Sequence, residues 1–416
     1  MRRPFKSNAQ KRSVDSQRLT MLAQAIDQSA SRLEERNWEN QLDSLLRKLM
    51  KNDHQDIIDA ALDHAFKLES SAYDALMECA EAASESCQIE QDGIQYDALL
   101  IAAPILAWTR FSIAAGAIPA EAHASLSAHL YAHVLAPNVK MAMAPMLFSI
   151  DQLPRSHTDA FALTQRLALS ALKGSPVKAA PQQPETAPFL ADTRYLVAAV
   201  TAVAGEPLFR WQELPDPIAR DQALSHWNAQ AMPTIARLLP GCGVELLLPE
   251  AYFAACREGD RQIRPASIRA AVHYLTHTMS VEPDALQAIV GGFGEEANGG
   301  RVDEYRISFT LLKDQDVIYG IVWPLYGPED GEELPYRAVD LTADPLLASE
   351  VDRKSPLEEI FALLEECGVP NVKHHIEHFA MEFCDDCGSP LFPDMDGELV
   401  HAEMPEDAPT GSGHLH

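Results

Sequence analysis

The chain has 416 residues, of which 47% are hydrophobic and 23% are charged, so it can build two or three domains that each bury a core. Its net charge of −28 gives an acidic surface that repels phosphate groups and disfavours nucleic-acid binding. The apolar run from Ala98 to Thr109 is shorter than the roughly 20 residues that a membrane-spanning helix needs. Neither nucleic acid nor a membrane is therefore an expected partner.

The seven cysteines are odd in number, and all but the last two are widely scattered along the chain. No secretory signal is recognisable before them, because the basic first residues lack the apolar stretch of a signal peptide. Both features are typical of a protein of the reducing cytoplasm. Five Lys and Arg residues and no acid among the first twelve positions predict a disordered basic tail over residues 1–15.

Residues 16–88 have the apolar spacing of amphipathic helices. Leu19, Leu22 and Ile26 recur at intervals of three and four, and three further stretches with this spacing follow. The short polar segments between them favour antiparallel packing of neighbouring helices. The sequence therefore predicts a helical region over residues 16–88.

A first α/β unit is predicted over residues 89–173, where compact apolar runs alternate with helices. The runs are Leu99 to Trp108 and Val139 to Ile150, and the expected helices are Ala120 to Leu135 and Thr158 to Leu172. This order is typical of βαβ structure.

Residues 174–188 contain four prolines and no large apolar residue other than Val177, which predicts an exposed linker. Beyond it, a second α/β unit over residues 189–330 begins with the same order of elements. An apolar run from Tyr195 to Ala204 is followed by a helix from Ile218 to Leu239 and a run from Val244 to Leu248.

The repeated order suggests an internal duplication. Any two βαβ units share such an order, however, so the identical residues are too few to establish one. If the duplication is real, aromatic and basic side chains of both units could line a pseudo-symmetric cleft that binds an anionic or aromatic ligand, or they could simply stack at the ends of the sheet. These side chains are Trp108, Arg110 and Phe111 in the first unit and Phe209, Arg210 and Trp211 in the second.

The rest of the second unit is expected to contain helices over Pro265 to Met279 and Glu282 to Val290, then a glycine-rich joint at residues 291–294. A β-hairpin follows, with strands from Tyr305 to Leu312 and from Val317 to Leu325. The last segment, residues 331–416, is acidic: from Glu329 onward there are 22 acidic and four basic residues. It contains one further helix, Leu357 to Cys367, before the final cysteine pair.

Cys384 and Cys387 are separated by two residues and followed by Gly388, a spacing that can present two sulfurs to one tetrahedral zinc ion. A redox pair is the first alternative, and two inert thiols are the second. Pro390 prevents a helix from starting directly after the thiols, and the acidic neighbours are expected to raise the pKa of the thiols and to attract cations. A metal site is therefore favoured over redox chemistry.

His378 and His401 are the predicted partners of the two thiols. His378 precedes Cys384 by six positions, and a turn after Cys387 could bring His401 back beside the sulfurs. A site closed by Cys and His ligands is structural, since a catalytic zinc needs an open position. The other candidate ligands that stay open are His374, His375, Cys367, His414 and His416.

Two histidine pairs stand one helical turn apart, His129 with His133 and His273 with His277. Neither first histidine is followed by the glutamate that a zinc protease uses as its general base. Solvated helix residues are the favoured interpretation. The sequence also lacks a phosphate-binding Walker loop, a Gly-x-Ser-x-Gly elbow and a dinucleotide-binding fingerprint.

Several unusual stretches are spread along the chain: YDALLIAAP at 96–104, SIDQLP at 149–154, VDEYR at 302–306, VIYGIVWPLY at 317–326, CDDCG at 384–388 and VHAEMP at 400–405. Together they resemble an uncharacterised bacterial family, domain of unknown function 2863. The resemblance spans nearly the whole chain and implies a bacterial cytoplasmic protein, but it implies no activity, substrate or catalytic residue.

The sequence thus predicts an α+β protein with an N-terminal helical region, a central mixed α/β region that could be duplicated, and a C-terminal segment resembling a zinc knuckle. The favoured function is a non-catalytic binding or regulatory protein with structural zinc, whose partner is an unknown protein or a second copy of the chain. The alternative is an enzyme of unrecognised class with a site between the two α/β units. A third interpretation is a nucleic-acid-associated factor that uses the basic tail and the knuckle.

Overall fold

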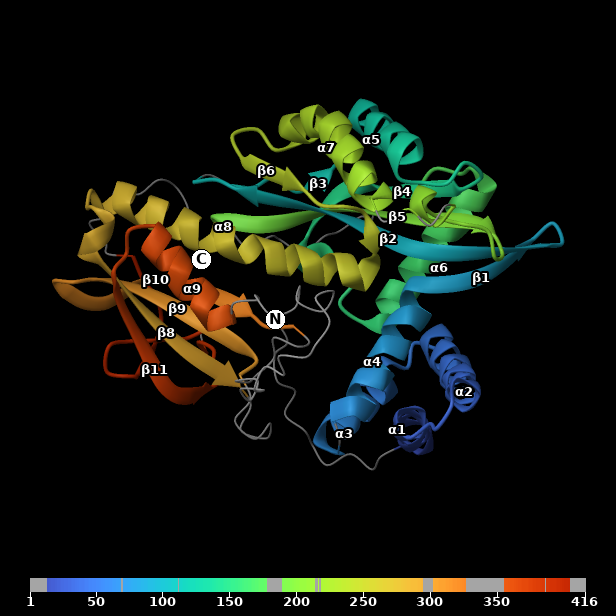
Figure 1. Cartoon of the computed structure of the whole chain (residues 1–416), viewed down its shortest axis with the longest axis horizontal. Coiled ribbons are helices and arrows are strands. Elements are labelled where there is room, and N and C mark those ends of the chain that lie inside the picture. Colours follow the sequence, from blue (N-terminus) through green and yellow to red (C-terminus); the bar gives the residue numbers. More distant parts are fainter. Residues whose placement is uncertain are drawn as a thin grey trace, which may run out of the picture.

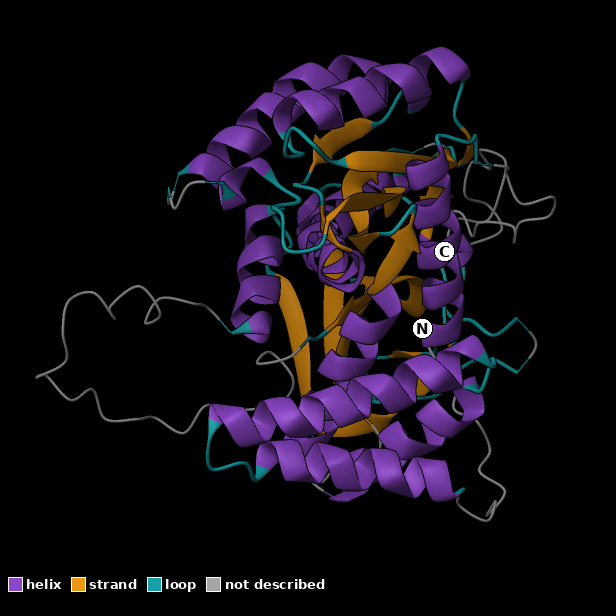
Figure 2. Cartoon of the chain, turned by 90° about the vertical axis from the view of Figure 1, so that its right-hand side faces the viewer, coloured by secondary structure: helices purple, strands orange, loops and turns teal. Residues whose placement is uncertain are grey.

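The computed structural model describes residues 13–68, 70–110, 112–177, 189–213, 216, 218–294, 302–326, 355–385 and 387–404. These residues form a group of N-terminal helices, a seven-stranded sheet with helices on both faces, and a four-stranded sheet that carries helices on one face (Figures 1 and 2). The predicted α+β class is confirmed. Of the predicted linker and acidic segment, residues 178–188, 327–354 and 405–416 lie outside the described residues.

The N-terminal helices pack around their own core, in which Leu19, Leu46, Ile58 and Leu76 are completely buried. Ser13 begins the first helix as its N-cap, because its hydroxyl accepts a hydrogen bond from the Ser16 amide. Residues 1–12 of the predicted tail are outside the described residues, whereas residues 14 and 15 already belong to the first helix. The helices are α1 (Val14–Asp27), α2 (Arg32–Lys51), α3 (Gln55–Leu68) and α4 (Ser70–Glu85).

The seven-stranded sheet has the strand order β1-β2-β5-β4-β3, with β6 and β7 also pairing with β2. Every neighbouring pair is antiparallel. The expectation of parallel βαβ units is therefore wrong, because β5 inserts between β2 and β4 and runs opposite to both. The strands are β1 (Ser86–Gln91), β2 (Ile94–Trp108), β3 (Gly116–Ala117), β4 (Lys140–Ser149), β5 (Ala191–Val203), β6 (Gly243–Leu246) and β7 (Glu250–Ala251).

The two α/β units interlock within this one sheet. In the first unit, β2 is followed by α5 (Ala120–His133), β4 and α6 (His157–Lys173). In the second, β5 is followed by α7 (Ala219–Leu238), β6 and α8 (Tyr252–Met279). Strand β5 lies between β2 and β4, and β2 lies between β5 and β6, so each unit holds a strand of the other. The units thus share a core, and a duplication stays a prediction.

Helices cover both faces of the shared sheet. On one face, α5 and α7 contribute Leu126 and Trp227 to the core. On the other, α6 and the first half of α8 contribute Leu167 and Ala255. Strand β2 is buried on both faces because it lies in the middle of this three-layer arrangement (Figure 1).

Helix α8 links the two sheets, since its first half packs on the seven-stranded sheet and its second half, with Ile268 and Leu275, packs on the four-stranded sheet. It is longer than the helix predicted from Pro265, because this proline lies inside it. At the joint, the buried carboxylate of Asp260 accepts hydrogen bonds from Tyr195 (3.1 Å) and Tyr326 (2.9 Å). One acidic side chain thereby connects β5, α8 and the end of β10.

The four-stranded sheet has the order β10-β9-β8-β11, in which only β11 is parallel to its neighbour. Helices α8 and α9 cover one face through an apolar core. The predicted helix from Glu282 to Val290 is wrong: only Pro283–Ala285 forms a helical turn, and the remainder starts β8, whose short apolar run fills the core under both helices. The elements are β8 (Leu286–Gly294), β9 (Glu304–Leu311), β10 (Asp314–Pro324), α9 (Pro356–Glu366) and β11 (Asn371–Ala380).

The opposite face of this sheet carries the C-terminal hairpin of β12 (Phe392–Pro393) and β13 (Leu399–Val400). Side chains alternate along β9, so Arg306 and Ser308 point to this face while Ile307 and Phe309 point to the helices. The glycine-rich residues 291–294 belong to β8 and form no separate joint. None of the helices in the described ranges combines the length and hydropathy that a membrane crossing needs.

Candidate metal centre

A tight turn presents the two predicted thiols on one side of the chain. The Cys384 amide donates to the Ser389 carbonyl and the Gly388 amide donates to the Cys384 carbonyl, both at 2.8 Å. Gly388 has a φ of +73°, a conformation that residues with a Cβ rarely adopt, and it allows the turn to close. A β-bridge between Phe383 and Pro390 forms the base of the turn. We call residues 383–390 the knuckle.

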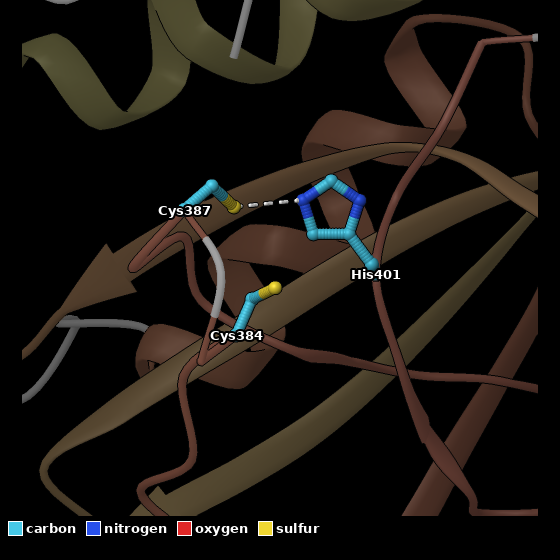
Figure 3. Close-up of side chains that lie close together, drawn as sticks. All are labelled: Cys384, Cys387 and His401. Atoms are coloured by element: carbon cyan, nitrogen blue, oxygen red, sulfur yellow. Dashed lines mark hydrogen bonds between the residues drawn. The ribbon is translucent and has the colours of Figure 1, made fainter.

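The hairpin of β12 and β13 brings His401 back to the knuckle. Its turn is built by Asp394, whose carboxylate accepts hydrogen bonds from the amides of Asp396 and Glu398 at 2.8 Å. Gly397 completes it with a φ of +85°. The strand that leaves this turn passes beside the knuckle, and the His401 ring faces the two sulfurs (Figure 3).

The three donor atoms lie close enough to share one metal ion. The Cys387 Sγ atom is 3.3 Å from Nε2 of His401, and the ligand atoms of Cys384, Cys387 and His401 all lie within 4.8 Å of one another. With bond lengths of about 2.3 Å to sulfur and 2.0 Å to nitrogen, a tetrahedral zinc ion would place its ligand atoms about 3.5–3.8 Å apart. The spacing therefore fits a metal ion with only small adjustments of the side chains.

The carboxylate of Glu403 lies beside the outer ring nitrogen of His401. One carboxylate oxygen lies 3.2 Å from Nδ1 of His401, on the side of the ring away from Cys387. A carboxylate beside the outer nitrogen of a ligating histidine favours the tautomer that leaves the inner nitrogen free to bind a metal.

Arg306 holds the base of the knuckle on the sheet. Its side chain is fully buried and donates hydrogen bonds to the carbonyl oxygens of Glu382 (2.8 Å) and Leu391 (2.6 Å), which lie just outside the two ends of the knuckle. The guanidinium also lies over the rings of Phe293 and Phe383, and it pairs with Glu304 at 2.7 Å. Burial lowers the pKa of Arg306 from its ordinary value, against the opposing effect of Glu304.

The sequence interpretation missed Arg306. The signal was present in VDEYR at residues 302–306, because Glu304 and Arg306 are two positions apart in a strand and must face the same side. A charged pair on one face of an otherwise apolar strand indicates a covered, hydrogen-bonded surface.

The expected rise in the thiol pKa is wrong for Cys387. Hydrogen bonds lower the pKa of Cys387 to about 6. The largest effect comes from the side chain of Ser389, and smaller effects come from the backbone amide of Ser389, from Cys384 and from His401. These contacts act at hydrogen-bond distance, whereas the acidic side chains around the exposed thiol are screened by water. A lower pKa favours the thiolate, which is the form that binds a metal.

The other predicted ligands lie elsewhere. His378 is exposed on β11 opposite Gly292 and does not join the three donors. The His374 ring packs edge-on against Phe361, and Nε2 of His375 lies 2.8 Å from the Asp394 carbonyl. Cys367 caps the end of α9, and residues 414 and 416 are outside the described residues.

The histidine pairs on helices form no comparable cluster within the ranges that the structure describes. The rings of His129 and His133 are 6.4 Å apart and that of His226 on α7 is 5.6 Å from His133, while the rings of His273 and His277 are 4.8 Å apart. Four of the aromatic and basic residues of the cleft hypothesis have structural contacts, and Phe111 lies outside the described residues. Phe209 and Trp211 stack at 4.6 Å, Arg210 donates to the Tyr131 carbonyl, and the Trp108 ring covers Gly243.

Comparison with known proteins adds one relationship. No curated protein and no solved structure matches the chain. The family described as "Protein of unknown function (DUF2863)" matches residues 4–415, which is nearly the whole sequence. The chain therefore belongs to the DUF2863 family.

Proposed function

We propose that the knuckle and His401 bind a zinc ion whose role is structural, in a cytoplasmic protein that acts by binding and not by catalysis. The observation that carries this proposal is that two thiols and one imidazole lie within 4.8 Å of one another. The thiols precede the C-terminal hairpin in the sequence and the imidazole follows it. A metal at this point would join residues 384 and 401 through the ion. It would thereby close the last described segment into a loop.

The donor set favours zinc over other common ions. Thiolate and imidazole ligands suit zinc, whereas calcium and magnesium require oxygen ligands. The cysteines of the described residues are all unpaired thiols, which supports the reducing compartment in which such a site persists.

A structural role is supported by the way in which the knuckle is attached. Arg306 clamps both of its ends, and Phe392 of the adjoining hairpin packs directly on Gly320 of β10. A metal that fixes the knuckle therefore also fixes the C-terminal hairpin on the four-stranded sheet. Coupling of metal binding to folding is common in small segments that have little apolar core of their own.

The binding role rests on β11, the outermost strand of the four-stranded sheet among the described residues. Ile376 on this strand is 86% exposed, and an exposed strand edge is a ready template for pairing with another chain. The pairing of β11 with β8 shifts register between His375 and His378, so Ile376 lies at an irregular point of the strand, where the same side chain of a second copy could cover it. The partner that we propose is therefore a second copy of the chain.

Metal analysis of the purified protein tests the zinc site. The wild type is expected to carry one zinc per chain, and Cys384→Ser and Cys387→Ser are each expected to lose most of it. Cys367→Ser is the matched control, because this thiol lies at the end of α9 and outside the cluster. Zinc-free wild-type protein, or equal zinc in all variants, would refute the site.

A further inference from the structure

We propose that His129, His133 and His226 form a second metal site, in which three imidazole rings bind one divalent transition-metal ion such as zinc. The first two histidines lie on α5 and the third lies on α7. These helices cover one face of the seven-stranded sheet, away from the knuckle. An ion at this point would join the two helices to each other.

The packing of α5 against α7 supplies the third histidine. The helices lie side by side (Figure 1). Toward the start of α5, the hydroxyl groups of Ser125 and Thr234 are 3.3 Å apart, and at its end the rings of His133 and His226 have centroids 5.6 Å apart. The two helices therefore run in opposite directions. His129 lies between these contacts, one helical turn from Ser125 and one from His133.

The separations of the rings are close to those of imidazoles that share an ion. Two rings bound to one tetrahedral zinc ion by bonds of about 2.0 Å have centroids about 5 Å apart. The corresponding distances are 5.6 Å between His133 and His226 and 6.4 Å between His129 and His133. The rings of the α5 pair are stacked, so rotation of the side chains must turn one nitrogen of each ring toward a common point.

The three rings are accessible to an ion from solvent. His226 is exposed, and His129 and His133 are half-buried. Partial burial, followed by His226, His129 and Arg210, lowers the pKa of His133, which favours the neutral ring that binds metals. The guanidinium of Arg210, which donates to the Tyr131 carbonyl at 3.1 Å, opposes a second cation nearby. We therefore expect weaker binding than at the thiolates of the knuckle, so that purified protein retains only the zinc of the knuckle.

Three imidazole donors select the class of ion. Imidazole nitrogens bind zinc, nickel and copper, whereas calcium and magnesium require oxygen ligands. Two histidines one turn apart on a helix already provide two ligands to such an ion, as they do in the helix of zinc proteases. A third ring from the neighbouring helix should raise the affinity, because it adds a donor that the fold already places beside the pair.

Titration calorimetry of the full-length protein with Zn²⁺ at neutral pH tests this site. The wild type should bind one further equivalent, beyond the zinc of the knuckle, with micromolar affinity. His226→Gln should weaken this binding at least about tenfold, which is about 1.4 kcal/mol, because it removes one of three donors. The side chain of His226 is exposed, so this variant should keep the wild-type melting temperature. His273→Gln is the matched control, since it changes one histidine of the other helical pair, and it should leave the binding unchanged.

Four results would overturn the proposal. The first is no further equivalent below about 1 mM zinc. The second is equal affinity of the wild type and His226→Gln, which would limit the site to the pair on α5. The third is loss of the event in His273→Gln, which would place the ion on α8. The fourth is loss of the event in Cys384→Ser, which would assign it to the knuckle. Retention in Cys384→Ser would support the histidine site even if the knuckle itself bound no zinc.

Discussion

Arg306 on β9 donates a hydrogen bond of 2.8 Å to the carbonyl oxygen of Glu382, two residues before the first thiol of the metal centre. The same nitrogen donates to the carbonyl of Leu391 beyond the second thiol, so one buried cation holds both strands of the knuckle. The metal centre is therefore an extension of the four-stranded sheet. Substitutions in the sheet should alter metal binding, and loss of the metal should loosen the contact of the knuckle and the C-terminal hairpin with the sheet.

Replacement of Arg306 tests this connection. Arg306→Met removes the clamp and leaves Glu304 as a buried charge without its partner, so we expect a loss of about 3–5 kcal/mol in the free energy of unfolding. Urea denaturation followed by fluorescence measures it, and zinc affinity should fall in parallel. Arg269→Met is the control: its pair with Glu366 is exposed, and its loss should change the free energy of unfolding little. Equal effects of the two variants would show that Arg306 is not a clamp.

The C-terminal hairpin packs on Gly320 of β10 through the ring of Phe392. A Cβ added there would lie 2.3 Å from the ring of Phe392, so Gly320→Ala must displace the hairpin or the strand. We expect a destabilisation of about 1–3 kcal/mol, measured by thermal denaturation. Phe392→Ala in the same chain should relieve the clash, and the two substitutions together should then be much less than additive. Simple additivity would contradict this contact.

His401 and His378 were both predicted as ligands, and the geometry now separates them. His401→Asn should reduce zinc affinity by at least about tenfold, because it removes one of three donors. His378→Asn should leave the affinity unchanged, since this ring is exposed on β11 and outside the cluster. Competition with a colorimetric chelator measures both. An equal loss of zinc affinity in His378→Asn and His401→Asn would show that His378 is also a ligand.

Glu85 joins α4 to α8 through a contact whose contribution to stability depends on pH. Its carboxylate accepts a hydrogen bond from the Phe253 amide at the start of α8, and burial raises the pKa of Glu85 to about 7. Because the folded pKa lies above the unfolded value, the stability that this group contributes is present below about pH 4.5 and is lost as the pH rises through 7. We expect the loss to be about 3 kcal/mol.

Glu85→Gln should flatten this dependence, because the amide oxygen can still accept the Phe253 hydrogen bond while no proton is lost. Thermal unfolding between pH 5 and 8 provides the comparison, and Glu90→Gln, which changes an exposed carboxylate on β1, should keep the wild-type slope. A Glu85→Gln variant with the slope of the wild type would refute the assignment.

The sequence predicted most elements and the three donors that the structure brings together, Cys384, Cys387 and His401, together with His378, which lies outside this group. Periodicity placed α1 to α4 and the hairpin of β9 and β10, and the spacing of Cys384, Cys387 and Gly388 indicated the knuckle. Periodicity could not distinguish a buried strand from a helix in the short apolar run of β8, nor could it show that β5 inserts between β2 and β4. Pairing between distant strands leaves no local signal. The spacing of Glu304 and Arg306 indicated a covered charged pair, but the two carbonyl groups that Arg306 binds are 76 and 85 residues away and left no signal beside it.

X-ray absorption at the zinc edge of the protein purified from cells tests the central claim most directly. The account predicts two sulfur neighbours at about 2.3 Å and at least one imidazole nitrogen at about 2.0 Å. The sulfur shell should disappear in the Cys384→Ser and Cys387→Ser double variant. A zinc ion surrounded only by oxygen and nitrogen in the wild type would contradict the metal centre.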